Sequence, residues 1–127
     1  MIQRMMVLLL LCASLSACSQ GRLDEGQLDI RDAYVERIEI EILETEPAQV
    51  QVTAYGNFIS GCMTLHETEQ RREGNTFFVK ITVAEPAGES CPPVAPPFTE
   101  TVMLDGEFSS GTYTVDVNGV TETFTLP

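Results

Sequence analysis

The sequence has no tryptophan, one histidine, one lysine and few basic residues of any kind. Its 127 residues carry 7 Lys and Arg against 19 Asp and Glu, a formal net charge of −12. Proteins that bind nucleic acid neutralise phosphates with basic patches, so this balance argues against a nucleic-acid partner. Charged residues make up 20% and hydrophobic residues 43% of the chain, which is typical of a folded chain rather than a disordered one. The length suits one domain of ordinary size.

The N-terminal residues have the pattern of a secretory signal. A short basic segment, Met1–Arg4, precedes an apolar run, Met5–Ala13, that is too short for a membrane-spanning helix, which needs about 20 residues. Leu15-Ser16-Ala17-Cys18 then resembles the lipobox of bacterial lipoproteins, in which an aliphatic residue and two small residues precede a cysteine. The alternative is an ordinary signal peptide cut at a small residue, with Cys18 incidental.

The lipoprotein resemblance implies cleavage before Cys18 and attachment of fatty acyl chains such as palmitate to that residue. We therefore expect residues 1–17 to be a signal peptide, 18–33 a lipidated tether and 34–127 a β-sandwich domain. Several acyl chains are enough for stable anchoring, so the protein is expected outside the cytoplasm on a bacterial membrane. Ser19 resembles the pattern of lipoproteins of the outer membrane, if the organism has one.

After residue 35 the sequence alternates with a period of two, which is typical of half-buried strands. Two pairs of turn residues, Gly74-Asn75 and Asn118-Gly119, divide these runs, and Asn-Gly is a strong hairpin signal. The pattern predicts seven strands, at 36–43, 49–55, 63–71, 76–84, 99–104, 111–117 and 121–126. Short strands at this spacing indicate an antiparallel β-sandwich. A rough helical spacing leaves a short helix as an alternative within residues 19–35.

One stretch points to the type of sandwich. In Phe108-Ser-Ser-Gly-Thr-Tyr113, a glycine stands two residues before a tyrosine that starts a strand. The stretch resembles the tyrosine corner of immunoglobulin-like and fibronectin-type domains, which implies a seven-stranded immunoglobulin-like sandwich in which the Tyr113 hydroxyl bonds an upstream backbone group. The chain departs from true immunoglobulin domains, because it has no tryptophan and no cysteine near Tyr113. The segment Gly111–Gly119 is also similar to the closing hairpin of small secreted bacterial sandwich domains, a likeness that implies no activity.

Two cysteines remain once Cys12 leaves with the signal peptide and Cys18 carries lipid. An even pair in an oxidising compartment predicts a Cys62–Cys91 disulfide, which stabilises by roughly 3–4 kcal/mol in the chain-entropy model. Metal ligation is the rival interpretation, but only His66 lies close by and there is no Cys-x-x-Cys motif. We expect no metal and no cofactor.

The segment Glu85–Pro97 is the one long irregular connection, and it holds five of the seven prolines. Proline cannot donate to a sheet ladder, so the segment must be a loop or an extended edge. Tied by the disulfide, it either crosses between two sheets or presents a binding surface together with the adjacent Asn57–Cys62 turn. The candidate partner contacts are Phe78, Pro92, Pro93, Val94, Pro96 and Pro97. The other interpretation of Phe78 is packing under this loop.

The remaining polar residues offer little chemistry. His66 lies in a predicted strand, where its neighbour Glu67 should point to the opposite face and leave it without a partner. Asp105-Gly-Glu107 is only a fragment of a calcium-binding loop. The glutamates within residues 36–46 are interpreted as the solvated side of an edge strand, with a docking site for a cationic partner as the alternative.

The sequence therefore predicts a lipid-anchored, non-catalytic binding or interaction module of the bacterial cell envelope. An envelope protein is the simplest partner. The alternative is a small protease inhibitor that presents a disulfide-braced loop, because a stiff loop binds with less ordering cost. An inhibitor should show that loop as an exposed ridge, whereas an enzyme should show a deep cleft with convergent polar groups.

Overall fold

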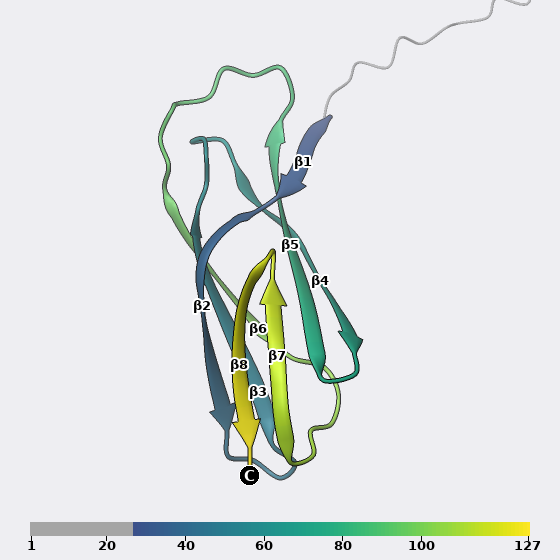
Figure 1. Ribbon diagram of the computed structural model, residues 1–127. Helices are drawn as coiled ribbons and strands as arrows, with labels where there is room; N and C mark the ends of the chain where they lie inside the picture. Colours follow the sequence, from purple (N-terminus) through teal and green to yellow (C-terminus); the bar gives the residue numbers. More distant parts are fainter. Residues whose placement is uncertain (1–26) are drawn as a thin grey trace, which may run out of the picture.

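The computed structural model describes residues 27–127, which form eight strands in two sheets (Figure 1). The strands are β1 (Leu28–Asp32), β2 (Tyr34–Leu43), β3 (Gln49–Asn57), β4 (Thr64–Glu73), β5 (Thr76–Pro86), β6 (Pro97–Met103), β7 (Gly111–Val117) and β8 (Val120–Leu126). The five-stranded sheet contains β1, β4, β5, β7 and β8, and the three-stranded sheet contains β2, β3 and β6. These residues include no helix that could cross a membrane. Cys18 and the expected signal peptide lie outside the described residues.

The predicted all-β sandwich is confirmed, with two differences. There are eight strands instead of seven, and one pair of neighbours, β5 and β7, is parallel rather than antiparallel. Both predicted hairpins are present: Gly74-Asn75 joins β4 to β5, and Asn118-Gly119 joins β7 to β8. Asn118 has a φ of 49° and Gly119 a φ of 91°. Asparagine and glycine tolerate such left-handed backbone angles, which is why this dipeptide favours a tight hairpin.

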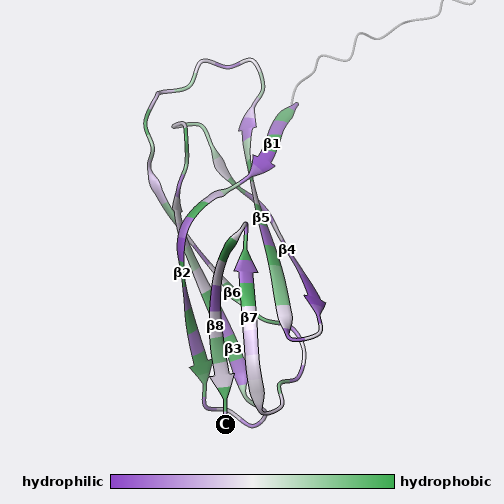
Figure 2. Ribbon diagram, viewed as in Figure 1, coloured by the Kyte–Doolittle hydropathy of each residue, from purple (hydrophilic) through white to green (hydrophobic). Residues whose placement is uncertain are grey.

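The core lies between the two sheets and is built from one face of each strand. Along β5, Phe77, Val79, Ile81 and Val83 are all buried. Each buried side chain of this size contributes roughly 1.5–3 kcal/mol relative to exposure. In contrast, β4 is largely hydrophilic (Figure 2) and stands at an edge of the five-stranded sheet, where charge discourages pairing with other chains.

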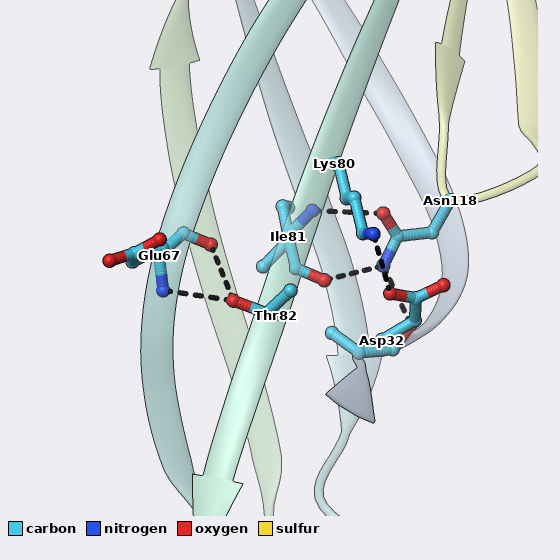
Figure 3. A network of polar contacts seen from close by, with 7 residues as sticks. Asp32, Glu67, Lys80, Ile81, Thr82 and Asn118 are labelled. Carbon is cyan, nitrogen blue, oxygen red and sulfur yellow. Dashed lines mark hydrogen bonds and ion pairs between the residues drawn. The ribbon is translucent and has the colours of Figure 1, made fainter. Parts of the chain in front are cut away.

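The central strand β5 shares one of its edges between two partners. Its first half pairs with β7 over Thr76–Val79, and its last five residues pair with β1 over Thr82–Pro86. The Asn118 side chain closes the gap between them: its amide oxygen accepts from the Ile81 N–H at 2.9 Å, and its amide nitrogen donates to the Ile81 carbonyl at 2.8 Å (Figure 3). The same nitrogen donates to the Ala33 carbonyl at 2.8 Å. The Asn118 side chain thus bonds the Ile81 backbone as a residue of a neighbouring strand would.

The strand β1 corrects two expectations about the N-terminal segment. The sequence pattern places residues 28–32 in the tether, with a helix as the alternative, but these residues form a strand antiparallel to β5. The physical reason is the free edge of β5 beyond the end of β7, which offers unpaired backbone groups to any chain nearby. A single residue, Ala33, then carries the chain from the five-stranded sheet into β2 of the other sheet.

A β-bulge corrects the expectation for His66. In β4, His66 and Glu67 together oppose the single residue Thr82 of β5, since the register passes from Leu65↔Val83 to Thr68↔Ile81. The Glu67 N–H donates to the Thr82 hydroxyl at 3.2 Å (Figure 3). A bulge breaks the alternation of faces. His66 Nε2 and Glu67 Oε1 consequently lie 3.8 Å apart instead of on opposite faces.

Candidate functional site

One end of the sandwich is formed by two of the connections that cross between the sheets. The turn at residues 58–63 joins β3 to β4, and the loop at residues 87–96 joins β5 to β6. Figure 1 shows this loop as the part of the fold that projects beyond the ends of β5 and β6. We call these two segments together the apical ridge. Of the two roles considered for the proline loop, crossing between sheets is confirmed.

Covalent and hydrogen bonds hold the two segments of the apical ridge together. The predicted Cys62–Cys91 disulfide is present, with a Cα–Cα distance of 5.5 Å. The Gly61 N–H donates to the Pro92 carbonyl and the Phe58 N–H to the Pro96 carbonyl, each at 2.9 Å. The loop is therefore fixed at both ends of the turn, so that little conformational entropy is left to lose on binding.

A glycine permits this close approach. A Cβ at Gly61 would lie 3.1 Å from both Pro92 Cβ and Val94 Cγ2, closer than most real side-chain contacts. The Asn57 amide adds a further link, because it donates to the Ala95 carbonyl at 3.0 Å. Residues 91–96 of the loop are thus held against the 57–62 segment.

The base of the apical ridge is attached to the body of the domain. The Phe58 and Phe98 rings pack with centroids 5.1 Å apart, and Met63 is buried in the core. The Glu85 carboxylate accepts from the Ser60 hydroxyl at 2.6 Å and from the Arg31 guanidinium at 3.0 Å. That carboxylate therefore joins the turn to both β5 and β1, a role that sequence reasoning did not find because its partners are distant in the chain.

The outer side of the apical ridge exposes apolar groups. Ile59 in the turn is 56% exposed and Val94 in the loop is 52% exposed. Of the predicted contact residues, Pro92 and Pro93 are also exposed, whereas Pro96 is half-buried. Pro97 lies in the first position of β6 rather than in the loop, at a sheet edge where a missing N–H costs little.

Phe78 does not belong to this surface. It lies near the start of β5, eight residues before Pro86, and strands rise about 3.3 Å per residue, so roughly 26 Å separates it from the loop. Its ring is half-buried and lies under the Arg71 guanidinium, 4.4 Å from the ring centroid. The alternative of packing under the proline loop is therefore wrong, and the structure divides the predicted contacts between two places.

Hollows also lie elsewhere on the described part of the molecule, the following two among them. A recess of about 440 Å³ beside Phe78 is lined by charged residues of mixed sign, among them Asp32, Arg71 and Lys80. A second hollow of about 790 Å³ lies at the end of the sandwich away from the apical ridge, between the β2–β3 turn and residues 108–110. Both are open depressions rather than the deep cleft expected of an enzyme. Within residues 27–127, no three His, Cys, Asp or Glu side chains gather as metal ligands would.

Two further sequence predictions concern side chains outside the apical ridge. The Tyr113 hydroxyl donates to the Ser109 carbonyl at 2.7 Å and accepts from the Ser109 N–H at 3.1 Å, which is the bonding that a tyrosine corner requires. The strand β2, which carries three of the glutamates at residues 36–46, is an edge strand of its sheet. Those three glutamates are exposed, as expected for a solvated edge.

Comparison with known proteins places the chain in a family. Residues 52–126, from β3 to β8, match the model of the ORF11 beta-sandwich domain. The chain is 34% identical over 92 residues to the uncharacterised 10.2 kDa protein in the HgiCIIM 5′ region of Herpetosiphon aurantiacus, which covers 72% of this chain and 98% of that protein. It is 36% identical over 80 residues to the corresponding protein of the HgiBIM 5′ region, covering 63% of this chain and 98% of that one.

No solved structure matches the chain. The matched family and relatives indicate no catalytic activity. The family match begins within β3, so it leaves out β1, β2 and the start of β3. It includes the apical ridge and the disulfide. On this evidence the chain belongs to the ORF11 beta-sandwich domain family.

Proposed function

We propose that this protein is a non-enzymatic binding module of the bacterial cell envelope, held at a membrane by lipid on Cys18. Its contact surface is the apical ridge. The observation that carries the proposal is the combination of exposed Ile59 and Val94 with a backbone braced by a disulfide. Rigid, exposed apolar side chains lose little entropy when they are covered.

The charges of the described residues support a binding role for this end. Residues 58–63 and 87–96 carry a single charged side chain, Glu89, in a chain with a net charge of −12. The centre of a protein interface is likewise depleted in charge, because charged groups are costly to desolvate. Few charged groups therefore need to lose their water when the apical ridge is covered.

In-cell photo-crosslinking tests the proposed surface. A photoreactive amino acid replaces Val94 in the full chain, and Met103, which is 41% exposed at the far end of β6, serves as the matched control. We expect adducts, to protein or to lipid, from position 94 and not from position 103. Equal labelling at both positions would contradict the assignment of the surface.

The anchor is tested separately. Cells fed labelled palmitate should label the wild-type chain, and the Cys18→Ala variant should lose both the label and its place in the membrane fraction. Retention of the variant in membranes would contradict the lipid anchor, while leaving the surface assignment untouched.

A protease inhibitor is the second candidate, and the exposed, braced residues Pro92–Ala95 favour it. In that case Val94 enters the small apolar pocket of an elastase-type protease. Purified protein is assayed against elastase and trypsin, with Val94→Asp as the control. Inhibition that the variant lacks supports this candidate, and no inhibition by the wild type removes it.

A further inference from the structure

The chain enters the described domain at the base of the apical ridge. The Ala87 N–H donates to the Gln27 carbonyl at 3.0 Å, and Leu28 of β1 pairs with Pro86 of β5. Figure 1 shows the N-terminal end of β1 at the same end of the molecule as the proline loop. Cys18 precedes Gln27 by nine positions, which limits their separation to about 30 Å at full extension. A lipid on Cys18 therefore holds this end of the domain close to the bilayer.

The exposed apolar residues gather at this same end. Seven large hydrophobic residues are exposed in the described chain, and five of them lie on the apical ridge, on β1 or at the start of β2. These five are Leu28, Ile30, Tyr34, Ile59 and Val94. The other two, Ile42 and Met103, lie at the opposite ends of their strands.

The backbone of the apical ridge is also suited to burial in a nonpolar environment. Pro92, Pro93 and Pro96 have no N–H, and the Val94 N–H donates to the Pro92 carbonyl at 2.9 Å. The carbonyls of Pro92, Ala95 and Pro96 accept hydrogen bonds from the 57–61 segment. Backbone groups that are bonded or missing cost less to move out of water than free ones.

The apical ridge itself carries little charge. Glu44, Glu46, Asp105 and Glu107 are exposed at the opposite end of the domain, and Asp29 and Glu36 are exposed on β1 and β2 beside the ridge. Anionic headgroups repel carboxylates, whereas the ridge, with Glu89 as its one charged side chain, meets little repulsion of its own. The orientation therefore follows from the attachment point and the apolar exposure.

We propose that the apical ridge rests on the bilayer surface, with Ile59 and Val94 reaching the boundary between headgroups and acyl chains. This inference rests on the proposed lipid anchor and names the lipid surface as the occupant of the proposed contact site. The anchor makes the contact intramolecular in effect, so that a few apolar side chains suffice to hold it.

Tryptophan fluorescence provides the test, because the chain has no tryptophan of its own. Lipidated full-length Val94→Trp and Met103→Trp variants are reconstituted into vesicles of phosphatidylethanolamine and phosphatidylglycerol. We expect the V94W emission to shift to the blue and to be quenched by lipids brominated in their acyl chains, with neither effect in M103W. Ile59→Trp, in the neighbouring turn, repeats the measurement if V94W does not fold.

Each other outcome overturns the inference in a recognisable way. Equal emission and equal quenching in V94W and M103W mean that the domain stands off the bilayer. A blue shift of V94W only in native membranes, and not in vesicles of pure lipid, means that a membrane protein occupies the ridge. That second result contradicts the bilayer as the occupant but leaves the proposed binding module and its contact surface standing.

Discussion

Asn118 offers the sharpest test of how the five-stranded sheet is held together. The substitution Asn118→Gly keeps the left-handed backbone of the hairpin, since glycine adopts a positive φ freely. It removes the amide that makes three hydrogen bonds, two to Ile81 and one to Ala33. The variant therefore isolates the bridging role of the side chain from its role in the turn.

The expected loss follows from those three bonds. At roughly 1 kcal/mol each they amount to about 3 kcal/mol, and the flexibility of glycine in the unfolded chain adds about 0.5–1 kcal/mol. Urea unfolding followed by circular dichroism should show the midpoint fall with the slope unchanged. Hydrogen exchange should show faster exchange at the Ala33 and Ile81 amides, because β1 loses its lateral support.

The matched control is Asn75→Gly in the other hairpin, where the amide makes one exposed hydrogen bond, to the Thr112 carbonyl at 3.2 Å. We expect that variant to lose no more than about 1–2 kcal/mol, on the same scale of bond and backbone costs. If Asn118→Gly is no less stable than Asn75→Gly, the side chain does not bridge the sheet and the reasoning is refuted.

Three further predictions concern the disulfide, Gly56 in β3 and the tyrosine corner. Replacing both Cys62 and Cys91 by serine should lower the free energy of unfolding by about 3–4 kcal/mol, since the disulfide joins residues 29 positions apart. Unfolding curves recorded with and without reductant should differ for the wild type and coincide for the variant. Gly56→Ala should cost about 2–3 kcal/mol or prevent folding, because the new Cβ would lie 2.0 Å from the Tyr34 carbonyl oxygen; soluble yield and thermal melting measure it, and a variant as stable as the wild type would show that β2 yields easily. Tyr113→Phe should cost about 1–1.5 kcal/mol by removing the hydroxyl bonds to the loop, and an unchanged melting temperature would count against the tyrosine corner.

Much of the fold was predictable because its signals are local. The Asn118-Gly119 hairpin depends on two residues that tolerate positive φ, and the alternation along β5 places Phe77 and Val79 in the core through backbone geometry alone. The Cys62–Cys91 pairing followed from counting, because only one pair remained. These features do not depend on which residues face them from the opposite sheet.

The positions of the predicted contact residues were foreseen only in part. Val94 and its neighbouring prolines are exposed as expected, but Phe78 lies far along β5 under Arg71. The error arose because a sequence shows that Phe78 faces outward without showing which end of the sheet it occupies or which side chain covers it. Glu85 was overlooked for a similar reason: its two partners, Ser60 and Arg31, meet it only after β1 has docked.

The sequence by itself determined the class of fold, the hairpins and the disulfide, because each depends on residues whose preferences act over a few positions or on a count. Only the tertiary structure decided that Leu28–Asp32 is a strand, since those residues are exposed and form β1 only where the edge of β5 is free. It also decided that His66 and Glu67 lie side by side, because a bulge depends on the register between two strands. Most of all, it placed the chain's entry point beside the exposed Ile59 and Val94, since long-range pairing, not local pattern, sets which ends of the strands meet.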